Sequence, residues 1–417
     1  MLQSLLNAWR LPDLRKRLLF TAFIIAMYRF GSFVPVPGID LQAIKDLVAG
    51  GGVFAFLDLF AGGALERVAV FALGIMPYIT AQIIFQLLTI VIPQLEALAK
   101  EGEAGSKKLN QYTRYLTVVL ALVQSVGYVF LFRTQGAFPP DNPLTPLKAY
   151  LIILTLTVGT GLIMWLGELI TQRGIGNGIS LIIFASIVSR LPGGLYKMFS
   201  TMNPLEWLLM AILALAVIAA IVLIQEGQRR IPIQYAKRVV GRRMYGGQST
   251  YLPLRVNMAG VIPVIFASSL LVFPVTVAQM TPWGWAKTVA DAVGPNTWWY
   301  LIGEVLLIVA FTYFYTAVQF NPLDQADNLK KYGGFIPGIR PGRPTAQYLD
   351  RVLTRITLPG ALFLASIAVL PTILIRGLGV PFFFGGTSLL IVVGVALDTM
   401  KQMESQLLMR HYEGFLK

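Results

Sequence analysis

Two glutamines inside an apolar run are the first side chains in this sequence that could do chemistry. Gln82 and Gln86 lie within residues 68–92, and at 100° per residue they share one helix face with Ile79 and Ile83. An amide in hydrocarbon is costly unless it meets protein or water. The stripe therefore predicts either hydrogen bonds to a neighbouring helix or the lining of an interior, and the spacing alone favours neither.

Catalytic and metal-binding residues are scarce. The 417 residues include no cysteine and a single histidine, His411, so thiolate nucleophiles, disulfides and histidine-clustered metals are excluded. Three carboxylates interrupt the apolar runs, and Glu168, Glu304 and Asp398 each fall toward a helix end rather than at the midplane. The glycine-rich stretch 174–178 lacks the preceding strand and the Lys–Ser/Thr pair of a phosphate-binding loop. The sequence therefore predicts neither an enzyme nor a cofactor site.

Apolar runs of membrane length recur along the chain, in which 56% of residues are hydrophobic and 13% are charged. This pattern predicts an all-α polytopic membrane protein. Two of the runs, 179–196 and 387–400, are weak, which favours short helices around a central cavity, although tilt or snorkelling is the alternative. The ten expected spans are 18–36, 68–92, 115–133, 147–170, 179–196, 205–225, 257–277, 298–318, 353–374 and 387–400.

The positive charge is distributed unevenly between alternate loops. The net charge is +14, and 25 of the 34 lysines and arginines fall in one set of connections. Because positively charged loops stay on the cytoplasmic side, these connections and both termini are expected in the cytoplasm. The connections are 1–20, 93–114, 171–178, 226–256, 319–355 and 401–417.

Three connecting segments are unusual. Residues 53–60, VFAFLDLF, are too short to span a bilayer and apolar enough to avoid water, which predicts a re-entrant half-helix; a surface-lying helix is the alternative. Loops 226–256 and 319–355 are long and basic, the first with the pattern of a hairpin and the second with a tight tip at Arg340. Topology and anionic lipid account for most basic loops, but this length and these apolar tips favour a docked partner.

Several long stretches resemble one family, the SecY subunits of the Sec protein-conducting translocon, and the resemblance covers essentially the whole chain. The matching stretches are FALGIMPYI at 71–79, KEGE at 100–103, NQYTRY at 110–115, RGIGNGIS at 173–180, GQRR at 227–230, NMAGVIP at 257–263, ADNLKK at 326–331, FIPGIRPG at 335–342 and GGTSLLI at 385–391.

The resemblance implies ten transmembrane helices in two halves, 1–196 and 197–417, around a central hourglass pore with a re-entrant plug at about 53–64. It implies a passive channel that moves unfolded preproteins across the membrane and releases apolar segments sideways into it. The residues themselves leave one alternative open, a secondary solute transporter whose substrate site includes Gln82 and Gln86.

The resemblance also assigns roles to individual residues. They form a pore ring (Ile79, Ile83, Ile179, Ile183, Ile265 and Ile391), a plug (Val53, Phe54, Phe56, Leu57, Leu59 and Phe60), a lateral gate (Gln82, Gln86 and Asn257) and a docking surface (Arg229, Arg230, Lys237, Arg238, Lys330, Lys331 and Arg340).

The implied partners are SecE-like and SecG-like membrane subunits, the SecA ATPase or the ribosome, signal-peptide-bearing preproteins and anionic lipids. No sequence-specific nucleic-acid contact is expected. Because the chain has no detectable nucleotide site, a partner must supply the energy. The implied location is the bacterial cytoplasmic membrane.

Overall fold

The computed structural model describes residues 11–49, 52–134, 136–138, 143–201, 203–235, 238–240, 243–245, 249–280, 284, 288, 290, 292–294, 297–378 and 386–415. The chain forms two compact units. The first, unit 1, comprises Met1–Asn203, Ser268–Ile302 and Val395–Lys417, and the second, unit 2, comprises Pro204–Ala267 and Gly303–Gly394.

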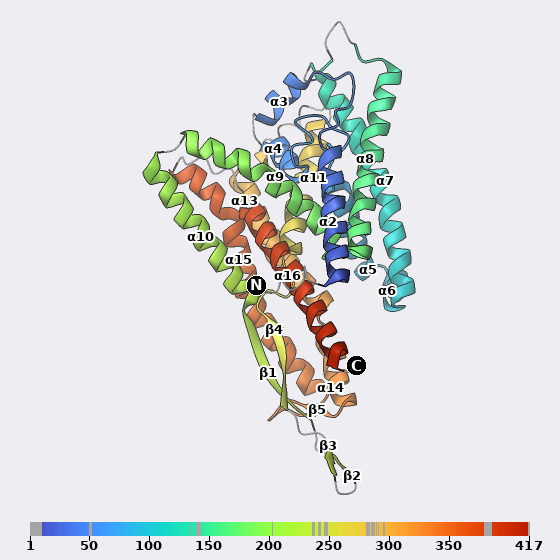
Figure 1. The fold of residues 1–417 in the computed structure, drawn as a ribbon, viewed down its shortest axis with the longest axis vertical. Coiled ribbons are helices and arrows are strands. Elements are labelled where there is room, and N and C mark those ends of the chain that lie inside the picture. Colours follow the sequence, from blue (N-terminus) through green and yellow to red (C-terminus); the bar gives the residue numbers. More distant parts are fainter. Residues whose placement is uncertain are drawn as a thin grey trace. The chain divides into compact units, whose positions relative to one another are not determined.

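Unit 1 is helical in its described N-terminal part (Figure 1). Its helices are α2 (Pro12–Gly31), α3 (Leu41–Ala49), α4 (Gly52–Phe60), α5 (Met76–Val91), α6 (Pro93–Lys100), α7 (Glu103–Thr134), α8 (Pro146–Arg173) and α9 (Gly178–Thr201).

Unit 2 combines long helices with a small sheet. Its elements are α10 (Pro204–Glu226), β1 (Gln228–Tyr235), β2 (Arg238–Val240), β3 (Arg243–Tyr245), β4 (Ser249–Arg255), α14 (Pro322–Lys331), β5 (Gly334–Phe335) and α15 (Arg343–Leu378). Three further helices each contribute residues to both units, namely α11 (Ile262–Met280), α13 (Trp298–Gln319) and α16 (Gly386–Phe415).

A helix occupies each of the ten expected spans. Among the described residues, six helices are long and apolar enough to cross a bilayer, and the pair α5–α6, bent by 101°, meets the same criterion as one broken span. The chain is therefore a multi-pass helical membrane protein. The six are Glu103–Thr134, Pro146–Arg173, Gly178–Tyr196, Pro204–Glu226, Trp298–Lys331 and Arg343–Ile373.

The helix expected from residue 68 begins only at Met76, so that boundary was wrong. Residues 61–75 form turns in which Gly74 has a φ of +60° and Val68 a φ of +42°. Left-handed backbone cannot continue a right-handed helix, and Pro77 in the first turn suits a helix start because its missing N–H is not needed there. The two runs expected to form short helices are instead parts of α9, with 24 residues, and α16, with 30.

The hairpin expected in loop 226–256 is confirmed. Strands β1 and β4 pair antiparallel with Ile231 opposite Leu252, and the sheet order is β4–β1–β5. Strands β2 and β3 form a second short ladder beyond the hairpin (Figure 1). The pairing of β5 with β1, through Gln234 and Phe335, was not expected from the sequence.

Glycine 159 lets the turns after α4 lie directly against α8. A Cβ atom at Gly159 would stand 2.0 Å from the carbonyl oxygen of Val70, whereas a Cβ at Gly161 on the same helix would meet nothing within 4 Å. The contact involves backbone, which cannot be rotated away as a flexible side chain can. Only glycine therefore permits this approach.

We expect Gly159→Ala to destabilise the protein and Gly161→Ala to leave its stability unchanged or slightly higher. Alanine favours an exposed helix by about 1 kcal/mol over glycine, but overpacking costs about 1–3 kcal/mol. Thermal unfolding of the purified protein in detergent measures both variants. Equal midpoints for the two would contradict the close approach at Gly159.

Candidate functional site

Helix α4 is a short apolar helix whose described side chains are mostly withdrawn from solvent. Phe54, Leu57 and Phe60 are buried and Leu59 is half-buried, whereas the side chains of Val53 and Phe56 lie outside the described residues. At nine residues the helix is too short to span a bilayer, and the turns that follow lead back to α5. The predicted half-helix is therefore present as a short buried helix, and its re-entrant path through the membrane stays a prediction.

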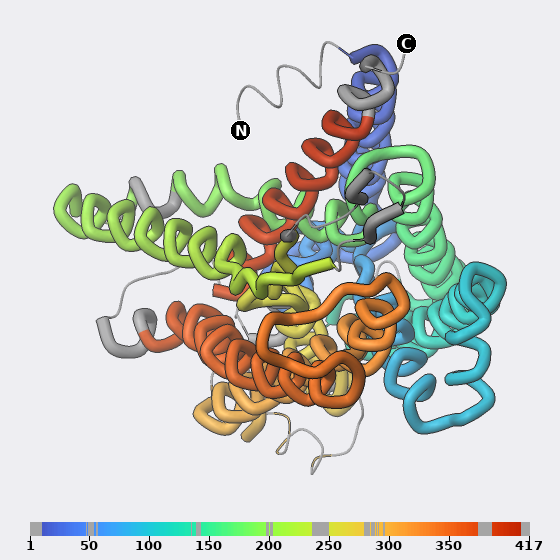
Figure 2. Tube along the Cα trace, turned by 90° about the horizontal axis from the view of Figure 1, so that it is seen from below, coloured from blue at the N-terminus to red at the C-terminus, as the bar shows by residue number. Residues whose placement is uncertain are grey.

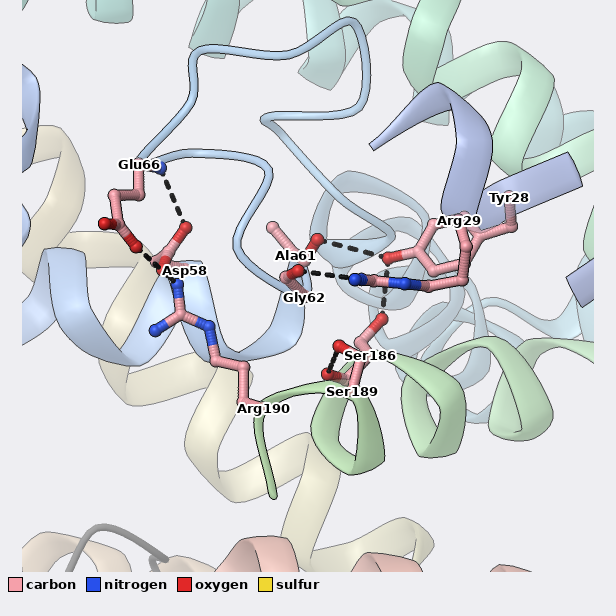
Figure 3. Close-up of polar contacts among 9 residues, drawn as sticks. All are labelled: Tyr28, Arg29, Asp58, Ala61, Gly62, Glu66, Ser186, Ser189 and Arg190. Atoms are coloured by element: carbon pink, nitrogen blue, oxygen red, sulfur yellow. Dashed lines mark hydrogen bonds and ion pairs between the residues drawn. The ribbon is translucent and has the colours of Figure 1, made fainter. Parts of the chain in front are cut away.

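A buried carboxylate ties α4 to α9. Asp58 is fully buried, and its Oδ2 forms an ion pair with the Nη2 of Arg190 (Figure 3). The same Nη2 lies 3.2 Å from Oε2 of Glu66, and the backbone N–H of Glu66 donates to Oδ1 of Asp58 over 2.9 Å. Because a buried charge is costly without a partner, this pair fixes where α4 can rest.

Helix α2 closes the C-terminal end of α4. The Tyr28 hydroxyl donates to the carbonyl oxygen of Ala61 over 3.3 Å and lies 2.6 Å from the Ser186 hydroxyl. Nη1 of Arg29 donates to the carbonyl oxygen of Gly62 over 2.9 Å (Figure 3). Carbonyls at a helix C-terminus lack intrahelical partners and carry partial negative charge, so a cation and a hydroxyl are suited to them.

Sequence reasoning missed these polar contacts around α4. We call them the polar seat, and they comprise Tyr28, Arg29, Asp58, Glu66 and Arg190. Arg29 and Arg190 lie outside the basic connections, and Asp58 is a single acid within the apolar segment 53–60. The sequence feature that could have predicted the ion pair is Asp58 itself, because an isolated carboxylate in an otherwise apolar segment requires a partner. Its partner lies 132 residues away, beyond the reach of any local pattern.

A hollow beside α4 has mixed walls. Leu57 of α4 lines it together with Thr80 of α5, Gln124 and Tyr128 of α7, and Thr276 of α11. The hydroxyl of Ser269 in α11 also lies 3.8 Å from the sulfur of Met76. The short helix thus faces a hollow whose other walls, from α5, α7 and α11, are partly polar.

The predicted ring and gate residues divide between the two units. In unit 1, Ile79, Ile83 and Ile183 are buried and Ile179 is half-buried, while Gln82 is exposed and Gln86 half-buried. The buried members in unit 2 are Ile265, Ile391 and Asn257. The Nδ2 of Asn257 donates to the carbonyl oxygen of Gly260 over 2.9 Å. Its Oδ1 is buried and has no hydrogen-bond partner among the described residues. The roles of these residues as ring and gate stay predictions.

The described parts of the two basic loops pack together as one body within unit 2. Residues of β1, β4 and α15 contribute to the apolar core that joins them. Helix α14 packs against α15, and the backbone trace in Figure 2 shows this region in orange. The buried members of this core are Ile231, Leu254, Phe320, Ile336, Leu349, Val352 and Leu353.

Four of the predicted docking cations flank that core and are exposed to solvent. Arg229 and Arg230 extend from β1, and Lys330 and Lys331 end α14. Arg340 is also exposed, and its carbonyl oxygen accepts a hydrogen bond of 2.8 Å from the Thr345 hydroxyl. Lys237 and the side chain of Arg238 lie outside the described residues. Charged residues from the two loops are thus held in place by one apolar core.

We expect Leu349→Ala to loosen this body, because Leu349 is fully buried and its truncation leaves a cavity that costs about 2–5 kcal/mol. Limited proteolysis of residues 226–256 should accelerate relative to wild type. Leu323→Ala, at an exposed leucine of α14, is the control and should leave cleavage unchanged. Cleavage at equal rates in both variants would show that the core does not hold the loops.

The geometry defines a class: a multi-pass membrane protein with a short buried helix and a group of exposed cations held on an apolar core. The SecY family model matches residues 69–400, so the chain belongs to the SecY family. The protein translocase subunit SecY of Streptomyces scabiei is 50% identical and that of Mycobacterium tuberculosis 48% identical, each over the whole of both chains.

Solved structures share the fold. A protein-conducting channel matches with a TM-score of 0.63 at 20% identity, covering 93% of this chain and 91% of that one. Two other solved structures also match over 93% of this chain and 91% of their own. One is a SecY whose plug domain is described as stabilising the closed state and maintaining a membrane seal (TM-score 0.61, 20% identity). The other is Sec61 in the canine ribosome–channel complex (TM-score 0.59, 19% identity).

Family membership settles the type of activity. The chain is a protein-translocating channel subunit and not an enzyme. The alternative of a secondary solute transporter gains no support from these relatives.

Proposed function

We propose that residues 53–64, with α4 at their centre, are the plug of this channel. The observation that carries the proposal is the polar seat: a short apolar helix is held by Asp58 and by the carbonyls that follow it. A segment that only filled space would need no buried ion pair, since apolar contacts serve that purpose at lower desolvation cost. The closed-state role described for the plug of a related SecY supports the same assignment.

The pore ring proposed for this chain consists of Ile79, Ile83, Ile179, Ile183, Ile265 and Ile391. An apolar ring offers a passing peptide no specific hydrogen bond, so chains of any sequence can slide through it. A narrow apolar constriction also resists wetting, which limits ion leak. Gln82, Gln86 and Asn257 are proposed members of the lateral gate between two halves, 1–196 and 197–417.

The exposed cations of the two basic loops, Arg340 foremost, are proposed to bind SecA or the ribosome. Exposed charge on a rigid base steers association and fixes orientation. A fold relative observed in a ribosome–channel complex supports a ribosome contact. SecE-like and SecG-like subunits, anionic lipids and preproteins complete the proposed partners. The proposed location is the bacterial cytoplasmic membrane with both termini on the cytoplasmic side, as the loop charges indicate.

We expect vesicles that hold this chain with a SecE partner to translocate a preprotein when SecA and ATP are added. Arg340→Glu should reduce the rate at least about tenfold, because reversing a docking charge adds repulsion to lost attraction. Lys45→Glu on the exposed face of α3 makes the same charge change and should have no effect. Equal rates in the two variants would remove Arg340 from the docking site. Absence of translocation in wild type, with a control translocon active, would overturn the proposed function.

Removal of residues 53–64 should raise the ion conductance of idle vesicles, because a buried barrier is taken away. Decay of a potassium diffusion potential, followed with a voltage-sensitive dye, measures the leak in vesicles of matched protein content. Conductance equal to that of the wild type would show that the segment is not the plug.

A further inference from the structure

Arg190 has two carboxylate partners, and they lie on opposite sides of a glycine pair. Asp58 precedes Gly62 and Gly63 and belongs to α4, whereas Glu66 follows them. Both glycines have positive φ, +66° and +84°. At such positions glycine moves between conformations that other residues avoid, so this is the natural place for the chain to pivot.

The two carboxylates differ in their surroundings. Asp58 is fully buried and accepts the Glu66 backbone N–H, so it is held from two directions. The Glu66 side chain keeps 38% of its exposure, and that of Arg190 keeps 30%. Arg190 can therefore lose Asp58 and still face a carboxylate close to water.

The segment on the Glu66 side is anchored independently of α4. The backbone N–H of Val36 donates to the carbonyl oxygen of Val68 over 2.9 Å, and that of Val70 donates to the carbonyl of Val34 over 2.9 Å. The carbonyl of Val70 also lies against Gly159 of α8. Residues just beyond Glu66 are thus fixed to Val34 and Val36, which follow α2, and lie against α8, while α4 is held by the polar seat.

From this arrangement we propose that Arg190 works as an ion-pair exchanger: Asp58 latches α4 in the closed channel, and Glu66 keeps Arg190 paired when α4 leaves. The exchange lowers the cost of opening, because a guanidinium left alone in a half-buried site would be penalised by desolvation. The planar fork of arginine suits such sharing, since one guanidinium can face two carboxylates at once. This inference rests on the proposed plug function of residues 53–64.

The exchange model gives the two carboxylates opposite roles. Asp58→Asn keeps an acceptor for the Glu66 N–H but removes the latch charge, so α4 should leave more easily and idle vesicles should leak about tenfold more. Glu66→Gln keeps the latch but removes the waiting partner. It should leave the leak at the wild-type level and slow translocation about threefold, as expected for a partly exposed pair.

The test measures leak and preprotein translocation side by side in wild type, Asp58→Asn, Glu66→Gln and a control, Asp46→Asn. Asp46 is an exposed acid of α3 that accepts a hydrogen bond from Gln42, so its neutralisation makes the same chemical change outside the seat. The exchange is supported if Asp58→Asn shows a high ion leak while Glu66→Gln shows slow translocation with a leak at the wild-type level.

Two results would overturn the exchange model. One is an ion leak in Asp58→Asn no higher than that in Asp46→Asn, and the other is an equal leak in Asp58→Asn and Glu66→Gln. The second would mean that both acids merely hold the structure together. Failure of wild type to translocate would instead count against the proposed function, whatever the leaks.

A second measurement separates latching from misfolding. The chain has no cysteine, so Asp58→Cys combined with Arg190→Cys creates a unique pair for a short bifunctional maleimide. The double variant should leak before cross-linking and return to the wild-type level after it. A leak that persists after complete cross-linking would show that the variant is damaged elsewhere and that the latch does not control the seal.

Discussion

The buried carboxylate of Asp58 is the constraint on which the rest of the seat depends. Removing an ion from water costs several kcal/mol even after relaxation, so Asp58 is stable only where Arg190 can reach it. Apolar contacts of α4 would permit small slides and rotations, but the ion pair permits one position. The hydroxyl of Tyr28 and the guanidinium of Arg29 then meet the carbonyls that this position presents. A hydrophobic segment thereby acquires a defined resting place.

Unit 2 handles charge in the opposite way. Its exposed cations remain in water, so they incur little desolvation free energy. Their positions are set by the apolar core that includes Ile231 and Leu349. A partner can therefore approach a preformed arrangement without the ordering cost of two free loops. In unit 1 a buried ion pair restrains a short apolar segment, whereas in unit 2 buried apolar residues hold exposed charges in place.

Much of this architecture could be predicted from sequence, because apolar runs and charge bias are local or additive signals. A helix at each of the ten expected spans, the short buried helix α4 and the β1–β4 hairpin all followed from them. The start of α5 at Met76 did not, since the apolar run already begins at residue 68 and hides the turns of residues 68–75. Nor did the β5–β1 pairing or the Asp58–Arg190 pair, because each joins segments far apart in the chain and leaves no periodic trace.

The glutamine stripe shows how far periodicity alone can go. Ile79 and Ile83 are buried as an inward face requires, yet Gln82 on the same predicted face is exposed. An amide in a membrane-spanning helix is costly against lipid, so the surface beside Gln82 must meet protein, water or a passing chain. The proposed lateral-gate role of Gln82 accounts for this exposure. In that role the amide would pair with protein or water while the gate is closed, and opening toward lipid would remove that pairing. An apolar segment of a passing chain would then leave only if its own transfer into lipid outweighed the lost pairing of the amide.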